Sequence, residues 1–204
     1  MHKKTKLLLG MLAFALLLWA AYFAYNQLQH LQDDEVINIV EHSRPHAYAQ
    51  ENVRESEDDY MLPELQQAPD FAMTDEAGNE IRLSDFIGRP VILNFWATWC
   101  PSCVQESPHF ETLHQEMGDA IEILKVVLLD GQRETRGRVD AFMAENDYTF
   151  PLYFDTTGQA SRAFGVSFIP VTFFINAEGY VAAGIQGAAS ENALRSGVDI
   201  ILQD

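Results

Sequence analysis

The sequence has few cysteines and few basic residues, and each shortage excludes a class of protein. Cys100 and Cys103 are the only cysteines in 204 residues, too few and too closely spaced for a small secreted scaffold held by several disulfides. The 13 Lys and Arg residues face 30 Asp and Glu residues, so the net charge is −17. Such a chain repels nucleic acid and lacks a basic groove for a phosphate backbone. We therefore expect no nucleic-acid partner.

The length and the hydrophobic content fit one globular domain. Of the 204 residues, 48% are hydrophobic, enough for a single buried core after an anchor and a linker are set aside. No internal repeat with a period of about 20–50 residues is visible, which argues against solenoids and propellers.

A long uncharged run lies near the N-terminus. A basic tip at residues 1–6 precedes Leu7–Tyr25, a run of 19 residues without a charge. As a helix rising about 1.5 Å per residue it would nearly span the ~30 Å hydrocarbon core. A cleaved signal peptide is the alternative, but its apolar region normally has only about 7–15 residues. Because positive residues stay inside, the sequence predicts a single-pass cell-membrane protein with an anchor over residues 1–27, a cytoplasmic N-terminus and an extracytoplasmic domain.

The segment after this run is strongly acidic. Between Asn26 and Asp70 there are 11 acidic and 2 basic residues, interrupted by three prolines. No apolar period is long enough for a stable packed element, so an extended linker is predicted over residues 28–67. An acidic docking arm is the alternative function for this segment. The folded domain is predicted over residues 68–204.

The domain alternates strand and helix patterns. Val91–Thr98 is a continuous apolar run typical of a strand buried on both faces, and the helical pattern Val104–Met117 and a second buried strand, Ile121–Leu129, follow it. The remaining predicted elements are a hairpin around the turn Asp75–Asn79, a helix over Glu134–Asn146, a strand over Leu152–Phe154, a helix over Gln159–Phe164, strands over Val171–Ile175 and Tyr180–Ile185, and a last helix from Glu191. This alternation predicts an α/β sheet with helices on both faces.

Cys100-Pro101-Ser102-Cys103 falls where the first buried strand ends and a helix begins. The helix dipole and the unpaired N–H groups at that point favour an anion, here a thiolate. Because the thiolate attacks disulfides, a pKa lowered from ~8.5 toward ~7 would make Cys100 the nucleophile at neutral pH. Cys103, one turn further on, is predicted to attack the mixed disulfide and release the partner.

Other uses of the cysteine pair fit the sequence less well. For zinc, His109 and His114 have the wrong offsets to complete a tetrahedral site. Covalent haem attachment needs a His directly after the second cysteine, where Val104 stands. A peroxidase of the peroxiredoxin kind needs Thr or Ser three residues before its cysteine, where Ala97 stands. A structural disulfide would close too small a loop to stabilise much. We therefore predict a redox-active disulfide, no metal and no cofactor.

Several motifs together resemble one family. They are APDF at residues 68–71, Gly78, LSDF at residues 83–86, Gly88, VILNFWATWCPSC at residues 91–103, Glu106, Pro108 and GVSFIPVTFFIN at residues 165–176. With them the chain resembles the thioredoxin-like proteins of the TlpA and ResA type from residue 68 to its C-terminus. The resemblance implies a three-layer α/β/α thioredoxin-like fold with a central mixed sheet, an N-terminal β-hairpin and a central helix-strand insertion.

The resemblance also implies roles for individual residues. Pro170 is expected to be cis, with the backbone of Ile169 facing the cysteines and hydrogen-bonding a partner chain. Glu106, one helical turn after Cys103, matches a glutamate near the disulfide and is the candidate general base for Cys103. Asn94 stands where thioredoxins carry a buried Asp, so no proton shuttle is expected from that position.

Two tryptophans flank the cysteines on their N-terminal side, and Pro101 lies between the two cysteines. Trp99 and Pro101 are predicted to contact the substrate, together with the backbone around Pro170. Trp96 is predicted to lie either on this docking surface or in the core.

The predicted function is a thiol-disulfide oxidoreductase that reduces the disulfides of exported proteins. By resemblance, the candidate partners are the haem-site cysteines of apocytochrome c, a secreted methionine sulfoxide reductase or other exported thiol proteins. The expected electron donor is a thiol-relay protein of the membrane. Anchoring near such a donor, and a Pro-Ser dipeptide without the His of strong oxidants, favour reduction. An oxidative folding catalyst or isomerase is the alternative enzyme. A metallochaperone is the alternative from another class, although such proteins use three residues between the cysteines.

Overall fold

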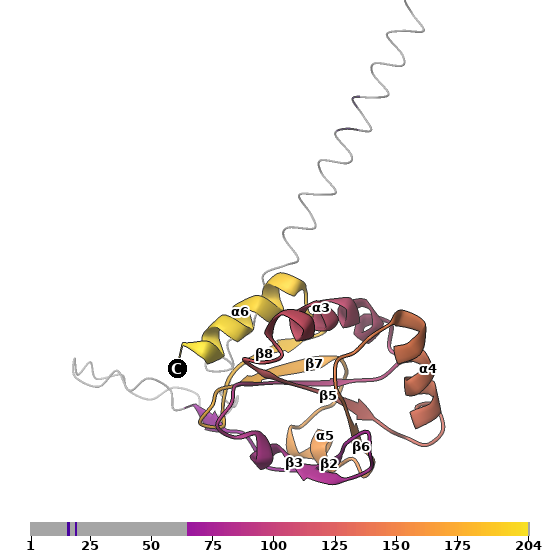
Figure 1. The fold of residues 1–204 in the computed structure, drawn as a ribbon, viewed down its shortest axis with the longest axis horizontal. Coiled ribbons are helices and arrows are strands. Elements are labelled where there is room, and N and C mark those ends of the chain that lie inside the picture. The colour runs from indigo at the N-terminus through magenta and orange to yellow at the C-terminus, as the bar shows by residue number, and fades with distance from the viewer. Residues whose placement is uncertain (1–15, 17–18, 20–64, 204) are drawn as a thin grey trace, which may run out of the picture. The chain divides into compact units, whose positions relative to one another are not determined.

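The computed structural model describes Leu16, Trp19 and residues 65–203 (Figure 1). The chain divides into two compact units, 1–35 and 36–204. In the first, Leu16 and Trp19 are helical and exposed. In the second, residues 65–203 form the folded domain.

Strands and helices alternate along residues 65–203. They are β1 (Gln66–Gln67), β2 (Ala72–Thr74), β3 (Glu80–Arg82), the 3₁₀ helix η1 (Leu83–Phe86), β4 (Val91–Trp96), α3 (Pro101–Met117), β5 (Glu122–Leu128), α4 (Arg136–Asn146), β6 (Leu152–Asp155), α5 (Gln159–Ala163), β7 (Val171–Ile175), β8 (Tyr180–Gln186) and α6 (Glu191–Leu202).

The described strands form one mixed sheet in the order β1-β8-β7-β4-β5-β6-β2-β3. β4 is parallel to β5 and β5 to β6, whereas β7 is antiparallel to β4. Every residue of β4 is buried, as expected for the central strand of a sheet covered on both faces. The cysteine pair follows at the carboxyl end of this strand, so the most deeply buried strand positions the site.

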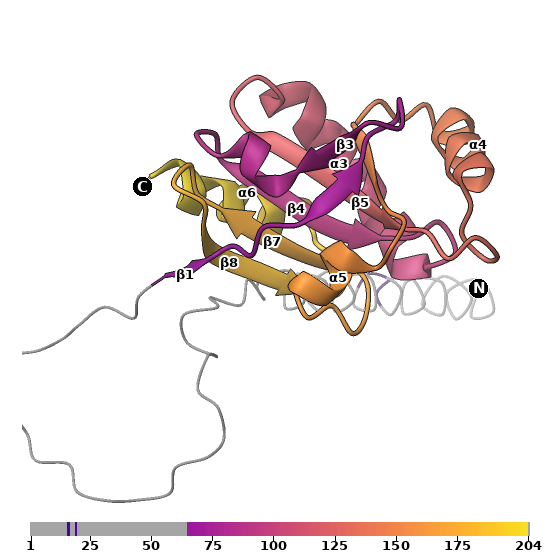
Figure 2. The ribbon, with the colours of Figure 1, turned by 90° about the horizontal axis from the view of Figure 1, so that it is seen from below.

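The two faces of the sheet bury different side chains of β4. Ile92 and Trp96 pack in one apolar cluster with residues of α3, α4 and α6, whereas Leu93 and Phe95 pack in a second with residues of α5 and the N-terminal hairpin. Figure 1 shows α3 and α6 on one side of the sheet and α5 on the other, and Figure 2 views the molecule from the α5 side. The fold is therefore a thioredoxin-like α/β/α arrangement of three layers, as predicted.

The predicted elements are confirmed with small shifts at their ends. The hairpin β2–β3 forms around its turn, and α4 and β6 stand in the place of the central insertion. α4 begins two residues later than predicted because the side chain of Thr135 caps it, accepting the N–H of Arg138. α3 begins earlier, at Pro101, because proline is well tolerated at the first helical position. The sequence analysis missed β1 and η1, which are too short to show a period.

The prediction that the protein is a single-pass protein of the cell membrane is wrong, and one finding contradicts it. Within Leu16, Trp19 and residues 65–203, no helix is long and apolar enough to cross a bilayer. The longest helix from α3 to α6 is α3, with 17 residues that include buried Glu106 and Glu111, whereas a span needs about 20 mainly apolar residues. Except for Leu16 and Trp19, the expected anchor lies outside the described residues, as does most of the expected linker. The boundaries set at 27/28 and 67/68 remain predictions.

Candidate active site

The two cysteines lie at the junction between β4 and α3. Cys100 is the N-cap residue of α3, and Pro101 takes the first helical position. The sulfur of Cys100 accepts the backbone N–H of Cys103 at 3.3 Å. Unpaired N–H groups and the positive end of the helix dipole therefore meet at this sulfur, and both favour a thiolate when the pair is reduced.

The two sulfurs differ in their access to solvent. Cys100 and Cys103 form a disulfide, and Cys100 is 5% exposed whereas Cys103 is fully buried. The Cys100 sulfur lies 3.7 Å from the carbonyl oxygen of Ile169. The peptide bond between Ile169 and Pro170 is cis, as the resemblance implied. The structure thus brings the cysteine pair and the backbone of the Ile169–Pro170 turn together, 69 residues apart in sequence.

A row of polar side chains crosses the interior of the sheet. Asn94 on β4 is in register with Thr172 on β7 and with Lys125 on β5, so the three side chains share one face. Asn94 Nδ2 donates to Thr172 Oγ1 at 3.0 Å, and Lys125 Nζ donates to Asn94 Oδ1 at 2.9 Å. A central amide therefore links the strand that carries the cis proline to the strand that carries the buried lysine.

Glu106 joins this row from α3. Its carboxylate accepts Asn94 Nδ2 and the N–H of Ala189, both at 2.9 Å, and lies 3.8 Å from Lys125 Nζ. Burial raises the pKa of the Glu106 carboxyl, although Lys125, the Ala189 N–H and Asn94 act in the opposite direction. A buried carboxyl with a raised pKa, one turn after Cys103, is the kind of group that can act as a proton acceptor.

Lys125 is fully buried and lies among aromatic rings. Its Nζ is 4.0 Å from the ring centroid of Phe110, 4.7 Å from that of Trp96 and 5.3 Å from that of Phe150, within the range of cation–π contacts. Burial lowers the pKa of Lys125 to about 8, although the charge of Glu106 raises it. Burial therefore shifts both members of the pair towards their uncharged forms, and their mutual attraction opposes this shift.

A buried carboxylate also holds the loop that leads to Cys100. Glu134 is fully buried, and its carboxylate accepts the backbone N–H of Thr98 and, at 3.0 Å, the Thr98 hydroxyl. Beside it, the Arg133 guanidinium carbon lies 3.4 Å from the ring centroid of Trp99. The segment between β5 and α4 therefore supports both residues that precede Cys100.

The sequence analysis missed Lys125 and Glu134. A signal for Lys125 was present, because one charged residue stands in the middle of an apolar strand pattern. No comparable signal exists for Glu134, whose partner Thr98 is 36 residues away. A contact over that separation depends on where the loop after β5 meets the loop after β4.

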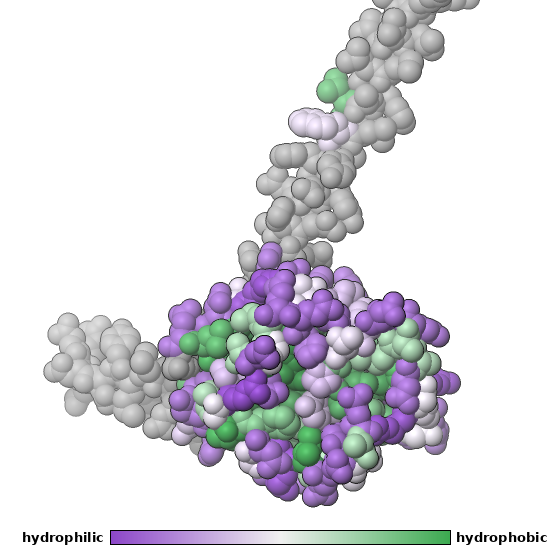
Figure 3. Space-filling view, viewed as in Figure 1, coloured by the Kyte–Doolittle hydropathy of each residue, from purple (hydrophilic) through white to green (hydrophobic). Residues whose placement is uncertain are grey.

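The predicted substrate-contacting residues occupy different depths. Trp99 is 38% exposed, Pro101 is exposed, Ile169 is half-buried and Pro170 is buried. Trp96 is fully buried beside Phe142 and Phe150 and belongs to the core. On the face shown in Figure 3, mainly hydrophilic side chains surround a more apolar central area.

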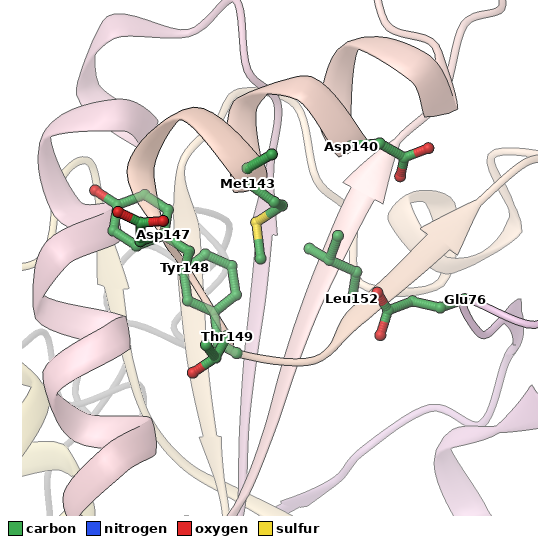
Figure 4. Close-up of a pocket in the computed structure, with 9 residues that line it drawn as sticks. Glu76, Asp140, Met143, Asp147, Tyr148, Thr149 and Leu152 are labelled. Carbon is green, nitrogen blue, oxygen red and sulfur yellow. The ribbon is translucent and has the colours of Figure 1, made fainter.

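A cavity elsewhere in the domain is separate from the cysteine pair. Within the described part of the chain, no group of three or more His, Cys, Asp or Glu side chains could hold a metal ion. A cavity of about 580 Å³ lies between α4, β6 and the N-terminal hairpin, and Figure 4 shows its acidic lining residues Glu76, Asp140 and Asp147. It is lined by neither cysteine, so the redox chemistry belongs to the surface at the start of α3.

A three-layer fold with a disulfide at this helix start, opposite a cis proline, defines a thiol-disulfide oxidoreductase of the thioredoxin-like class. Residues 65–183 match the model of the AhpC/TSA family, and the chain belongs to that family.

Curated relatives and solved structures also point to thiol-disulfide oxidoreductases. The chain is 34% identical to the thiol-disulfide oxidoreductase ResA of Bacillus subtilis over 141 residues, 69% of this chain and 76% of ResA. ResA of Geobacillus thermodenitrificans is 36% identical over 137 residues, 66% and 75% of the two chains. A thiol:disulfide interchange protein DsbE from Chlorobium tepidum superposes with a TM-score of 0.60 at 30% identity, over 68% of this chain and 96% of that one. StoA from Bacillus subtilis superposes with a TM-score of 0.56 at 26% identity, over 64% and 97%. The predicted resemblance and the oxidoreductase activity are confirmed.

Proposed function

We propose that this oxidoreductase works as a reductant of disulfides in exported proteins. The observation that carries the proposal is the sulfur of Cys100, which is capped by a helix N–H and lies beside the Ile169 carbonyl oxygen. An extended partner chain that hydrogen-bonds the backbone at Ile169 would bring its disulfide to this sulfur.

The reaction transfers two electrons and two protons. The Cys100 thiolate attacks one sulfur of the partner disulfide and forms a mixed disulfide, while the other partner sulfur leaves as a thiolate and takes up a proton. Cys103 then gives its proton to Glu106 and attacks the Cys100 sulfur, which releases the second partner sulfur as a thiolate. That thiolate takes up a proton, and Glu106 returns its proton to solvent. The partner ends as a dithiol and this chain as the Cys100–Cys103 disulfide. A thiol-relay donor restores the dithiol.

Sequence context supports reduction over oxidation. Pro101 and Ser102 separate the cysteines, and neither supplies the imidazole that helps strong oxidants to hold the thiolate. For such a reductant, haem-site cysteines of apocytochrome c and an exported methionine sulfoxide reductase are suitable partners, since both need a dithiol before they can function.

The reduction potential tests the direction. Equilibration with thiol-disulfide buffers, monitored by the fluorescence of Trp96 and Trp99, should give a midpoint nearer about −270 mV than about −120 mV. A midpoint above about −150 mV would overturn the proposed reducing role and would favour an oxidative folding catalyst.

A trapping experiment tests the partner class. In a Cys103→Ser variant the mixed disulfide at Cys100 cannot resolve, so partners should accumulate as covalent adducts that a reducing agent releases. Adducts restricted to proteins without a Cys pair would contradict the proposed partners. The matched Cys100→Ser variant should capture nothing.

A further inference from the structure

Arg133 forms part of the rim around Cys100. Its guanidinium lies over the face of Trp99, 3.4 Å from the ring centroid, and Trp99 directly precedes Cys100 and is 38% exposed. A partner chain that reaches the Cys100 sulfur must therefore pass close to this cation. Contacts between a guanidinium and an aromatic face leave the edge of the guanidinium free to donate hydrogen bonds.

The guanidinium of Arg133 differs from those of the other arginines in residues 65–203 in its hydrogen bonds. The others donate to carboxylates or backbone carbonyls: Arg82, Arg89, Arg136, Arg138, Arg162 and Arg195. Within the same residues, the guanidinium of Arg133 stacks on Trp99 and donates no hydrogen bond to a carboxylate or a backbone carbonyl. Its N–H groups are thus available for a carboxylate, which a guanidinium can bind through two parallel hydrogen bonds.

The backbone around Arg133 is held in place. Arg138 Nη1 donates to the carbonyl oxygen of Arg133 at 2.8 Å, and the neighbouring Glu134 carboxylate is fixed on Thr98. Asp130, three residues before Arg133, accepts the N–H groups of Glu134 and Gln132 at 2.7 Å and 2.9 Å. These N–H groups, and to a smaller extent the charge of Arg133, lower the pKa of the Asp130 carboxyl. Within the described residues the two side chains form no ion pair in direct contact, so the guanidinium keeps its hydrogen-bond donors for a partner.

We propose that Arg133 selects partner segments that carry Asp or Glu beside the disulfide under attack. The inference rests on the proposed function and adds the local chemistry of the substrate. Charge complementarity supports it, because the chain as a whole has a net charge of −17 and disfavours acidic partners everywhere except near such a cation. The exposed Phe168 and Val104, which neighbour the cis-proline turn and Cys103 in sequence, would meet apolar residues of the same segment.

Three disulfide peptides, identical except for Glu, Gln or Lys next to the attacked cysteine, test the proposal. Each kcat/KM is divided by the rate at which dithiothreitol reduces the same peptide, since a neighbouring charge changes the intrinsic reactivity of a disulfide. For the parent protein at low salt the Glu peptide should exceed the Gln peptide by about fivefold, the size expected for one partly exposed ion pair. Added salt should reduce this preference.

Variants separate this contact from the overall charge. Arg133→Gln should bring the Glu/Gln ratio to about one, and Arg133→Glu should make Lys the preferred neighbour. Arg162→Gln removes an equal charge on α5 and should keep the parent ratio. A parent ratio of one, or a ratio that survives Arg133→Gln, overturns the selection while efficient reduction of the Gln peptide still supports the proposed function. Failure to reduce any of the peptides would overturn both.

Discussion

The helix start around the cysteines and the polar network behind it adjust the ionisation of their side chains by different physical means. At the start of α3, the sulfur of Cys100 is bonded to that of Cys103 and also contacts two backbone groups, the N–H of Cys103 and the carbonyl of Ile169. In the interior, Glu106 and Lys125 place two ionisable groups 3.8 Å apart with no exposed surface. A helix terminus is enough to lower the pKa of a thiol, whereas burial is what raises the pKa of a carboxyl. We therefore expect Cys100 to provide the nucleophile and Glu106 to provide the proton acceptor.

Loss of the Cys100 sulfur should have the largest effect. Cys100→Ser should lower disulfide reductase turnover by about 1000-fold or more, because it removes the nucleophile itself. Insulin reduction provides the assay. Alkylation of the reduced parent at pH 7 gives an independent reading, with Cys100 expected to be labelled well before buried Cys103. Equal or reversed labelling would show that exposure and the helix terminus do not decide which sulfur attacks.

Removal of the interior carboxylate should have the next largest effect. Glu106→Gln keeps the size and hydrogen-bonding capacity but cannot accept the Cys103 proton, so resolution of the mixed disulfide should slow by about 100-fold at pH 7. Its pH dependence should also flatten, since the titrating group is gone. Rapid-quench measurements with a mixed disulfide at Cys100 would follow this step.

Glu111→Gln is the matched control for that variant. Glu111 lies on the same helix and is buried, but its carboxylate accepts the N–H groups of Thr149 and Phe150, away from the cysteines. If Glu111→Gln slows resolution as much as Glu106→Gln does, loss of a buried carboxylate is destabilising the helix and the general-base role is wrong.

The charge of Lys125 should make stability depend on pH. Its pKa falls to about 8 in the fold from the ordinary value of ~10.4 in an unfolded chain, so above the folded pKa the unfolded state binds more protons. Stability from this group therefore rises with pH. Between pH 7 and 9.5 the free energy of unfolding should increase by about 2 kcal/mol relative to a Lys125→Met variant. Urea titrations of both proteins measure the difference. A constant difference would mean that Lys125 keeps its proton throughout.

The support of the Cys100 loop by Glu134 should have the smallest effect. Glu134→Gln keeps an oxygen for the Thr98 N–H but loses the charge of this buried acceptor, so we expect about 1–2 kcal/mol less stability. Turnover should fall by only a few-fold, because the Cys100 sulfur is still capped by α3. Thermal unfolding and insulin reduction would be compared with an exposed control, Glu145→Gln. Loss of turnover without loss of stability would reassign Glu134 to the chemistry.

Sequence patterns predicted the elements well where they were long. The apolar run Val91–Thr98, the helix after it and the strand over Val171–Ile175 were identified because burial on two faces imposes a composition that local sequence displays. Short elements such as β1 and η1 were missed, since two to four residues show no period. The membrane location was predicted from residues 7–25 and contradicted by the finding on the described helices.

The sequence alone determined the redox chemistry, because the N-cap position of Cys100 and the spacing to Cys103 are local properties of one helix start. Tertiary structure decided everything that joins distant segments. It placed Ile169 at the Cys100 sulfur, Glu134 at Thr98, and Lys125 beside Glu106. These partners depend on strand order and register, in particular the pairing of Asn94 with Lys125 and Thr172 across neighbouring strands. Register follows from the packing of both faces of the sheet, which no single segment encodes.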